Sequence, residues 1–188
     1  MSLLQTAIID AIATHRSLAD LEPSLQRAAA LVSRCLKSGH QLLCCGNGGS
    51  AADASHFATE FLCRFMGERR PYPALSLSSE GGLVTAIGND YAFEEIFSRQ
   101  IRGLGRPGDI VVAFTSSGNS RNILRALEEA HKHGLESIAF LGKDGGFTRG
   151  VATIDLLVPG TITARVQEGQ KLLFHVLCEL VEQELPKE

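Results

Sequence analysis

The sequence has no tryptophan, only two tyrosines and no strong excess of either charge. Its 188 residues carry 18 lysines and arginines against 21 aspartates and glutamates, which gives a formal net charge of -3. A protein that binds nucleic acid usually presents a basic field, and this chain lacks one. Its apolar runs also end well before the roughly 18 residues that a membrane-spanning helix needs. We therefore expect neither a nucleic-acid partner nor a membrane partner.

The number and spacing of the cysteines argue against a disulfide framework. The five cysteines are an odd count, Cys44 and Cys45 are adjacent, and no CxxC pair occurs. The N-terminal segment places Asp10 inside its apolar pattern and has no basic stretch before it, unlike a secretory signal peptide. The chain also has no internal repeat or low-complexity linker, and 44% of its residues are hydrophobic. We expect one reduced, cytoplasmic domain over residues 1–188.

Apolar periodicity divides the chain into helices and short strands. Pro23 suits the first turn of the second helix, and Gly39 suits its end. The expected helices cover 3–18, 23–38, 51–66, 91–104, 121–133 and 166–185, and the expected strands cover 41–45, 74–77, 109–114, 137–141 and 154–158. This alternation is typical of a parallel sheet with helices on both faces, whose ligands bind at the carboxyl ends of the strands. That rule points to loops 46–50 and 115–120.

The first of these loops, GNGGS, is rich in glycine. Glycine permits positive φ angles and a close approach of the backbone to a ligand. We expect Ser50 to cap the following helix, with Asp53 completing a capping box. The helix N-terminus would then offer free N–H groups to a phosphate. The loop has no lysine and matches neither a Walker loop nor GxGxxG, so a simple strand-to-helix turn explains it equally well.

The second loop follows the most apolar strand and carries an excess of hydroxyl groups. Gly118 and Asn119 accompany four hydroxyl residues: Thr115, Ser116, Ser117 and Ser120. One cap suffices for one helix, so the remaining hydroxyls are free to donate hydrogen bonds to a phosphate. Two such loops at one edge of the sheet predict a phosphorylated small molecule as the ligand.

A cluster of polar side chains lies on the helix that follows the first loop. His56 and Glu60 are four residues apart, which places them on one face, and Asp53 lies one turn earlier on the same stripe. Taken alone, this pattern is more typical of a solvated helix face. Gln167 and His175 lie eight residues apart on the last helix, roughly 80° apart around its axis.

A metal site follows only if those two helices meet. His175 has apolar neighbours, so a hydrogen-bonded core histidine is the simpler explanation of that residue. If the helices converge, His56, Glu60 and His175 would hold a divalent metal, with the Gln167 oxygen as a weaker fourth ligand. Nitrogen and oxygen donors suit zinc.

Four segments together resemble the sugar isomerase (SIS) domain family, and most closely its bacterial phosphoheptose isomerases. They are CGNGGSAADASHF with Glu60, TAIGNDYAFEEIFSRQI, GRPGDIVVAFTSSGNSRNILRALEEA and ARVQEGQKLLFHVLCELVE. The resemblance covers nearly the whole chain. It implies a flavodoxin-like three-layer α/β/α sandwich with a five-stranded parallel sheet. It also implies a homotetramer with sites near subunit contacts. Residues 1–40 would form a helical pair, which packs either between subunits or in the core of one chain.

The resemblance also implies an activity and a set of site residues. Family members interconvert D-sedoheptulose 7-phosphate and D-glycero-D-manno-heptose 7-phosphate, a precursor of the heptose in lipopolysaccharide. Glu60 and His175 match the acid–base pair. The positions matching the ligands of one zinc per subunit are His56, Glu60, Gln167 and His175. The positions matching substrate contacts are Asn47, Gly48, Gly49, Ser50, Glu60, Asn89, Asp90, Thr115, Ser116, Ser117, Ser120 and Gln167.

These residues fit the chemistry of such an isomerase. Moving a carbonyl from C2 to C1 through an enediol requires a base that takes a proton from one carbon and an acid that delivers one to its neighbour. A carboxylate and an imidazole serve these roles, a metal polarises the carbonyl, and a phosphate held at a distance fixes the reacting carbons in place. Glu60 would act as ligand and as base at different times, because coordination lowers its basicity.

Several positions depart from the family pattern. Two and three residues after Gln167, the family typically has an apolar residue and a histidine, where this chain has Gly169 and Gln170. A glycine there costs about 1 kcal/mol of helix stability relative to alanine, and we expect it to loosen the frame around Gln167. Ala164 stands where some members have aspartate, and segment 78–82 differs from an Asp-containing form. These changes bear on substrate range more than on reaction type.

Three other functions stay open. Paralogues of this fold bind the bacterial replication initiator protein as non-catalytic tetramers, but they tend to lack the glutamate and the second histidine that are present here as Glu60 and His175. Regulatory SIS modules sense sugar phosphates, but they are usually fused to a DNA-binding or kinase domain. An isomerase of another sugar phosphate is the third alternative, because the loops recognise phosphate rather than stereochemistry.

Overall fold

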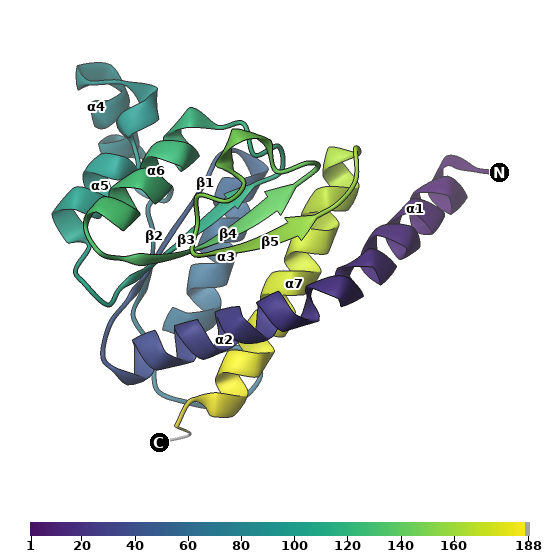
Figure 1. Ribbon diagram of the computed structural model, residues 1–188, viewed down its shortest axis with the longest axis horizontal. Helices are drawn as coiled ribbons and strands as arrows, with labels where there is room; N and C mark the ends of the chain where they lie inside the picture. Colours follow the sequence, from purple (N-terminus) through teal and green to yellow (C-terminus); the bar gives the residue numbers. More distant parts are fainter. Residues whose placement is uncertain (187–188) are drawn as a thin grey trace.

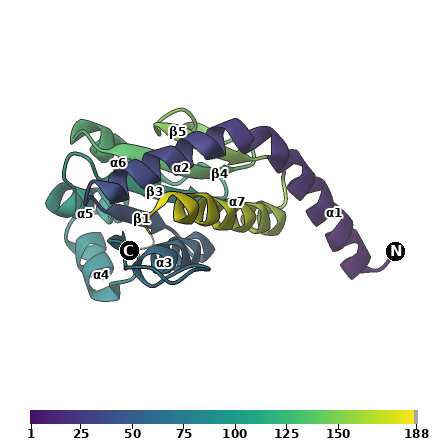
Figure 2. The same cartoon turned by 90° about the horizontal axis from the view of Figure 1, so that it is seen from below.

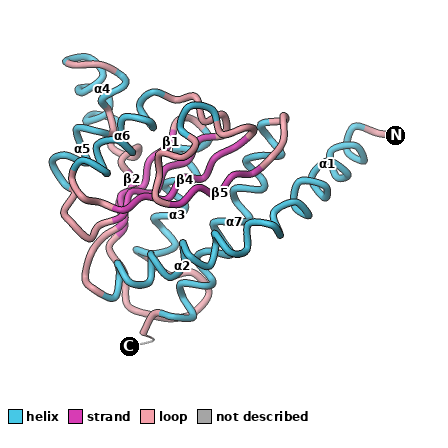
Figure 3. Tube along the Cα trace, in the orientation of Figure 1, coloured by secondary structure: helices cyan, strands magenta, loops and turns pink. Residues whose placement is uncertain are grey.

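The structure is a computed structural model that describes residues 1–186. Five strands form one parallel sheet in the order β2-β1-β3-β4-β5 (Figures 1 and 3). The strands are β1 Leu42–Gly46, β2 Ala74–Ser76, β3 Ile110–Thr115, β4 Glu136–Gly142 and β5 Ile154–Val158. The α-helices are α1 Leu3–Ser17, α2 Glu22–Lys37, α3 Gly49–Leu62, α4 Gly81–Asp90, α5 Ser98–Leu104, α6 Arg121–Lys132 and α7 Thr163–Glu184.

Helices cover both faces of the sheet. Along β1, Leu42 and Cys44 pack against α2, α3 and α7, while Leu43 and Cys45 pack into a second apolar cluster with α4, α5 and α6. Successive strand side chains point to opposite faces, so a strand buried on both sides must be apolar throughout, as β1 and β3 are. The expected three-layer α/β/α architecture with a five-stranded parallel sheet is confirmed.

Most elements lie within a few residues of their expected bounds, and the segment between β2 and β3 differs most. We did not expect α4, and the single helix expected over 91–104 is instead the 3₁₀ turn Phe93–Glu95 followed by α5. Ile87 is the one buried residue of α4, so this exposed, glycine-rich helix has no apolar stripe to reveal it. Ala92 has an extended backbone with φ -165° and ψ 156°, which interrupts the helical pattern.

The ends of two other helices also differ from the expectation. The third helix ends at Leu62 rather than at 66, and α7 begins at Thr163 rather than at 166. The expected start and end of α2 are confirmed, because Pro23 lies in its first turn and Gly39 follows it with φ 81°. All five cysteines are free thiols, as expected from their spacing.

The two N-terminal helices have different environments. α2 contributes buried residues such as Leu25 and Val32 to the core beside α7. α1 has no buried residue and projects beyond the rest of the protein (Figure 2). Its exposed apolar side chains are Leu3, Leu4, Ile8, Ile9 and Ile12. Of the two ways in which residues 1–40 could pack, packing in the core of one chain is therefore correct for α2 and not for α1. Within residues 1–186, no helix combines the length and apolarity that crossing a membrane would require.

A buried arginine fixes the C-terminal end of α3 against α7. The Arg69 side chain is 3% exposed and lies 3.3 Å from Glu182 of α7. Its guanidinium also donates hydrogen bonds to the carbonyls of Glu60 and Phe61, which are orphan acceptors at the end of α3. The other carboxylate oxygen of Glu182 accepts from the backbone N–H groups of Met66 and Gly67, so the pair is well satisfied.

We expect Arg69→Met to lower the free energy of unfolding by about 3 kcal/mol, because it leaves the Glu182 carboxylate without its cation and the Glu60 carbonyl without its donor. Urea denaturation at a fixed protein concentration measures this change. Arg125→Met is the matched control, since Arg125 is exposed and pairs with Glu128 on its own helix. Equal losses in the two variants would contradict the role given to Arg69.

Candidate active site

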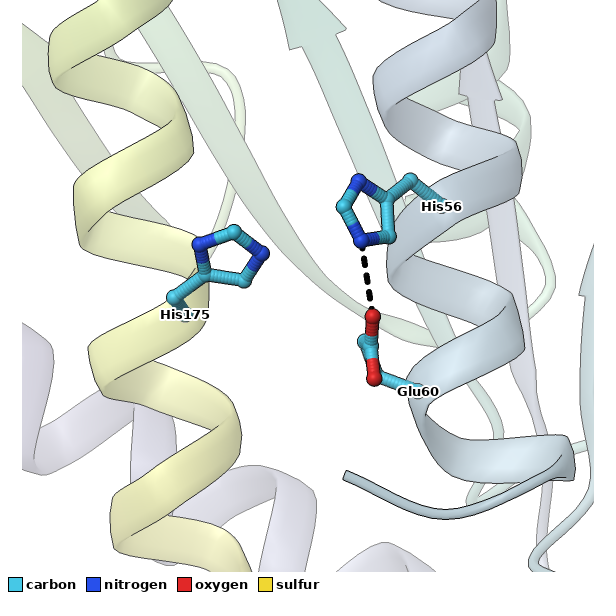
Figure 4. A group of neighbouring side chains, drawn as sticks. All are labelled: His56, Glu60 and His175. Carbon is cyan, nitrogen blue, oxygen red and sulfur yellow. Dashed lines mark ion pairs between the residues drawn. The ribbon is translucent and has the colours of Figure 1, made fainter. Parts of the chain in front are cut away.

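Three potential metal ligands meet between α3 and α7. The ligand atoms of His56, Glu60 and His175 all lie within 4.8 Å of one another (Figure 4). The His56 Nε2 is 2.7 Å from the Glu60 Oε1, and the two imidazole ring centroids are 5.1 Å apart. All three side chains are half-buried. The convergence of α3 and α7, which the sequence could not establish, is therefore present.

Aromatic packing holds the two imidazoles in place. The Phe174 ring lies 5.3 Å from the His56 ring in an edge-on arrangement, and Phe65 stacks on His175 at 5.8 Å. Behind them, Phe57 packs edge-on against Phe174 at 5.9 Å. Because these rings belong to the core between the helices and the sheet, the ligands project from a rigid base.

The chemistry of this donor set fits zinc. Burial lowers the pKa of His175, and the neighbouring His56 lowers it further, which favours the neutral imidazole that binds metal. Two nitrogens and one carboxylate oxygen are common zinc ligands, and they leave a fourth position that Gln167 or a substrate oxygen would fill. The expected set of His56, Glu60 and His175 thus fits a metal ion.

The glycine loop meets α7 through Gln167. A Cβ atom placed on Gly49 would lie 2.6 Å from the Gln167 Nε2, so a larger residue there would displace the end of the Gln167 side chain. Gln167 therefore lies against the loop, two turns of α7 before His175, and its role as the fourth metal ligand stays a prediction. In the same loop, the Asn47 amide exchanges two hydrogen bonds of 2.8 Å with Asn122 at the start of α6.

The capping box expected at the start of α3 is wrong. The helix begins at Gly49, its N-cap is Gly48 with φ 54°, and no side chain caps it. Ser50 already lies within the helix and is buried. The glycine takes the cap position because a left-handed backbone is strained for other residues. Asp53 instead forms an ion pair with Lys171 of α7, with 2.9 Å between the carboxylate and the ammonium.

The side chains of the hydroxyl loop differ in whether they bond to the backbone of the loop. Thr115 accepts a hydrogen bond from the Gly118 N–H, and Ser117 accepts one from the Asn119 N–H. Ser120 is the N-cap of α6, but its side chain makes no capping bond there. Gly118 has φ 66°, and a Cβ atom there would lie 1.9 Å from the Gly145 oxygen. The backbone amides and the hydroxyls of Ser116 and Ser120 are the groups suited to a phosphate.

Two predicted substrate residues lie on the other side of the sheet. Asn89 and Asp90 end α4, are exposed, and form a hydrogen bond of 2.9 Å with each other. α4 packs into the apolar cluster on the face opposite α7. Within one chain, therefore, Asn89 and Asp90 do not join the cluster of His56, Glu60 and His175.

The positions that depart from the family pattern are well packed. A Cβ atom on Gly169 would lie 2.8 Å from the Val158 side chain, so the glycine lets α7 approach β5 rather than loosening it. The fully buried Gln170 amide donates to the carbonyls of Thr115 and Phe140. In segment 78–82, the Ser78 hydroxyl donates to the Gly46 carbonyl at the glycine loop.

Sequence reasoning missed Lys171 as a site residue. Lys171 lies one turn after Gln167 and one turn before His175, so the same spacing that marked those two residues could have found it. It also missed Asn122, whose contact with Asn47 joins the glycine loop to the start of α6, 75 residues away in the chain, a pairing that no local pattern reveals.

Comparison with known proteins agrees with this geometry. The model of the SIS domain family matches residues 9–142. A phosphoheptose isomerase of Citrifermentans bemidjiense is 49% identical over 166 residues, which are 88% of this chain and 86% of that protein.

Two solved structures give the same result. A phosphoheptose isomerase from Francisella tularensis superimposes with a TM-score of 0.92 at 36% identity and covers 97% of this chain and 100% of that chain. One from Neisseria gonorrhoeae superimposes with a TM-score of 0.87 at 38% identity and covers 96% of this chain and 97% of that one. The chain therefore belongs to the SIS domain family and, within it, to the phosphoheptose isomerases.

Proposed function

We propose that this protein is the aldose–ketose isomerase that converts D-sedoheptulose 7-phosphate into D-glycero-D-manno-heptose 7-phosphate. The observation that carries the proposal is the meeting of His56, Glu60 and His175 in a chain 49% identical to a phosphoheptose isomerase. The reaction takes place in the cytoplasm and supplies heptose precursors of the lipopolysaccharide type.

Different residues of the site have different roles in the isomerisation. The hydroxyl loop, with Ser116 and Ser120, binds the phosphate and so holds the reacting carbons at a fixed distance. The Glu60 carboxylate takes a proton from C1 of the ketose, and an enediol forms as the C2 carbonyl oxygen gains a proton. The His175 imidazole then acts as the acid that delivers a proton to C2, while the C1 hydroxyl loses its proton and becomes the aldose carbonyl. A zinc ion held by His56, Glu60, His175 and Gln167 would polarise the carbonyl and stabilise negative charge on its oxygen.

The same side chains favour an enzyme over a scaffold. A tetramer that only binds another protein needs neither a carboxylate flanked by two imidazoles nor uncommitted hydroxyls at a helix start. The phosphate loop does not read sugar stereochemistry, so the heptose is assigned from the similarity to phosphoheptose isomerases.

Two features of the surface support a homotetramer. Five large apolar side chains of α1 are exposed, an arrangement that a neighbouring subunit would bury. Asn89 and Asp90 lie on the face of the sheet opposite α7, so they would reach a substrate only in a site shared between subunits. We infer that copies of the chain pack through α1 and complete one another's sites.

Incubation with sedoheptulose 7-phosphate, followed by NMR of the product, tests the reaction. We expect Glu60→Gln to reduce turnover by about a thousandfold, because the amide cannot accept the proton. The matched control is Glu68→Gln, which changes a carboxylate that is 89% exposed beyond α3. The absence of product from the wild type would refute sedoheptulose 7-phosphate as the substrate. Full activity in Glu60→Gln would refute the role of Glu60 as the base.

Removal of metal is the second test of the site. We expect a strong chelator to abolish turnover and a stoichiometric amount of zinc to restore it. Metal analysis after dialysis should find about one zinc per chain in the wild type and much less in His175→Gln. Undiminished turnover in the metal-free protein would contradict a catalytic metal.

Substitutions in α1 test the assembly. We expect Ile8→Asp with Ile12→Asp to dissociate the tetramer, because two charges would enter an apolar interface. Sedimentation equilibrium measures the mass of the assembly. Lys132→Asp, an exposed position on α6, makes the same change of two charges and should leave the tetramer intact. A monomeric wild type would contradict the proposed homotetramer.

A further inference from the structure

An ion pair lies directly behind the metal-ligand cluster. The Lys171 ammonium of α7 is 2.9 Å from the Asp53 carboxylate and 3.5 Å from the Nδ1 of His56. The Asp53 side chain is only 6% exposed, whereas Lys171 is 44% exposed and also lies 5.5 Å from the Phe174 ring centroid. Lys171 therefore contacts His56 on the ring nitrogen opposite the one that faces Glu60.

The position of the ammonium favours one tautomer of His56. An ammonium only donates hydrogen bonds, so the Nδ1 that faces it is the acceptor. In the tautomer that this contact favours, the ring proton is on Nε2, which faces the Glu60 Oε1 at 2.7 Å. A metal bound at Nε2 requires the opposite tautomer, with an N–H at Nδ1 that points at the ammonium.

Asp53 has the opposite effect on a bound metal. A histidine that binds metal usually donates its second N–H to a carboxylate, and losing such a partner costs about 10–100-fold in affinity. Asp53 lies one turn before His56 on the same helix and has the right chemistry for that partner. In this structure, however, its carboxylate pairs with Lys171.

We propose that Lys171 and Asp53 together set the affinity of the site for its metal: Lys171 weakens binding and Asp53 strengthens it. Lys171 places a positive charge beside a ligand of a cation and occupies the carboxylate that would otherwise support His56. Asp53 neutralises that charge. Both are positioning residues that act through His56, and the inference rests on the metal site of the proposed function.

The test measures the zinc dissociation constant by competition with a chromophoric chelator. We expect Lys171→Met to bind zinc about tenfold more tightly, and Asp53→Asn to bind it about tenfold more weakly. The double variant should return close to the wild-type value, because it removes the opposite charges of Lys171 and Asp53 together. Lys37→Met is the matched control, since Lys37 is 42% exposed, pairs with Glu184 at 3.4 Å and lies on α2. It should leave the constant unchanged.

A second measurement does not depend on metal. The ¹⁵N shifts of the His56 ring in the metal-free protein should indicate a proton on Nε2 in the wild type and a shift toward Nδ1 in Lys171→Met. Unchanged zinc affinity in Lys171→Met would overturn the inference and leave the proposed isomerase intact. A wild type that converts the substrate but binds no zinc would overturn both the inference and the proposed zinc site. A wild type that binds zinc tightly without converting the substrate would refute the proposed reaction alone.

Discussion

The packing of α3 against α7 is the constraint on which the candidate site depends. His56 and Glu60 come from one helix and His175 from the other, so their spacing is set by the distance between the two helix axes. The rings of Phe57 and Phe174 fill that space, and the Arg69–Glu182 pair fixes the far end. The metal ligands themselves contribute little to holding the two helices together, so their lone pairs are free to bind a metal or a proton.

Close backbone approaches at glycines bring the two loops to the same edge of the sheet. A Cβ atom on Gly46 would lie 2.2 Å from the Ser50 oxygen, and one on Gly118 would lie 1.9 Å from the Gly145 oxygen. Each glycine lets the backbone turn sharply between the end of a strand and the helix or turn that follows. The N-termini of α3 and α6 therefore point at the same region, where their free N–H groups favour an anion.

The sequence could predict the features that repeat with a regular period or are apolar throughout. The strands, most helices and the pairing of His56 with Glu60 belong to this group. α4 could not be predicted, because an exposed helix has no apolar stripe, and Ser50 was misplaced because the helix begins one residue before it. The Asp53–Lys171 pair depends on the register between α3 and α7, which only the folded chain sets.

One helix connects the glycine loop, the hydroxyl loop and the metal-ligand cluster. From its N-terminal end, α7 presents Gln167 to the glycine loop, Gln170 to the backbone of the hydroxyl loop, and His175 to the metal-ligand cluster. These contacts require α7 to lie close to β5, and Gly169 permits this because any side chain there would collide with Val158. The helix propensity lost at this glycine, about 1 kcal/mol, is offset by the packing that it allows. A shift of α7 would therefore disturb phosphate binding and metal binding together.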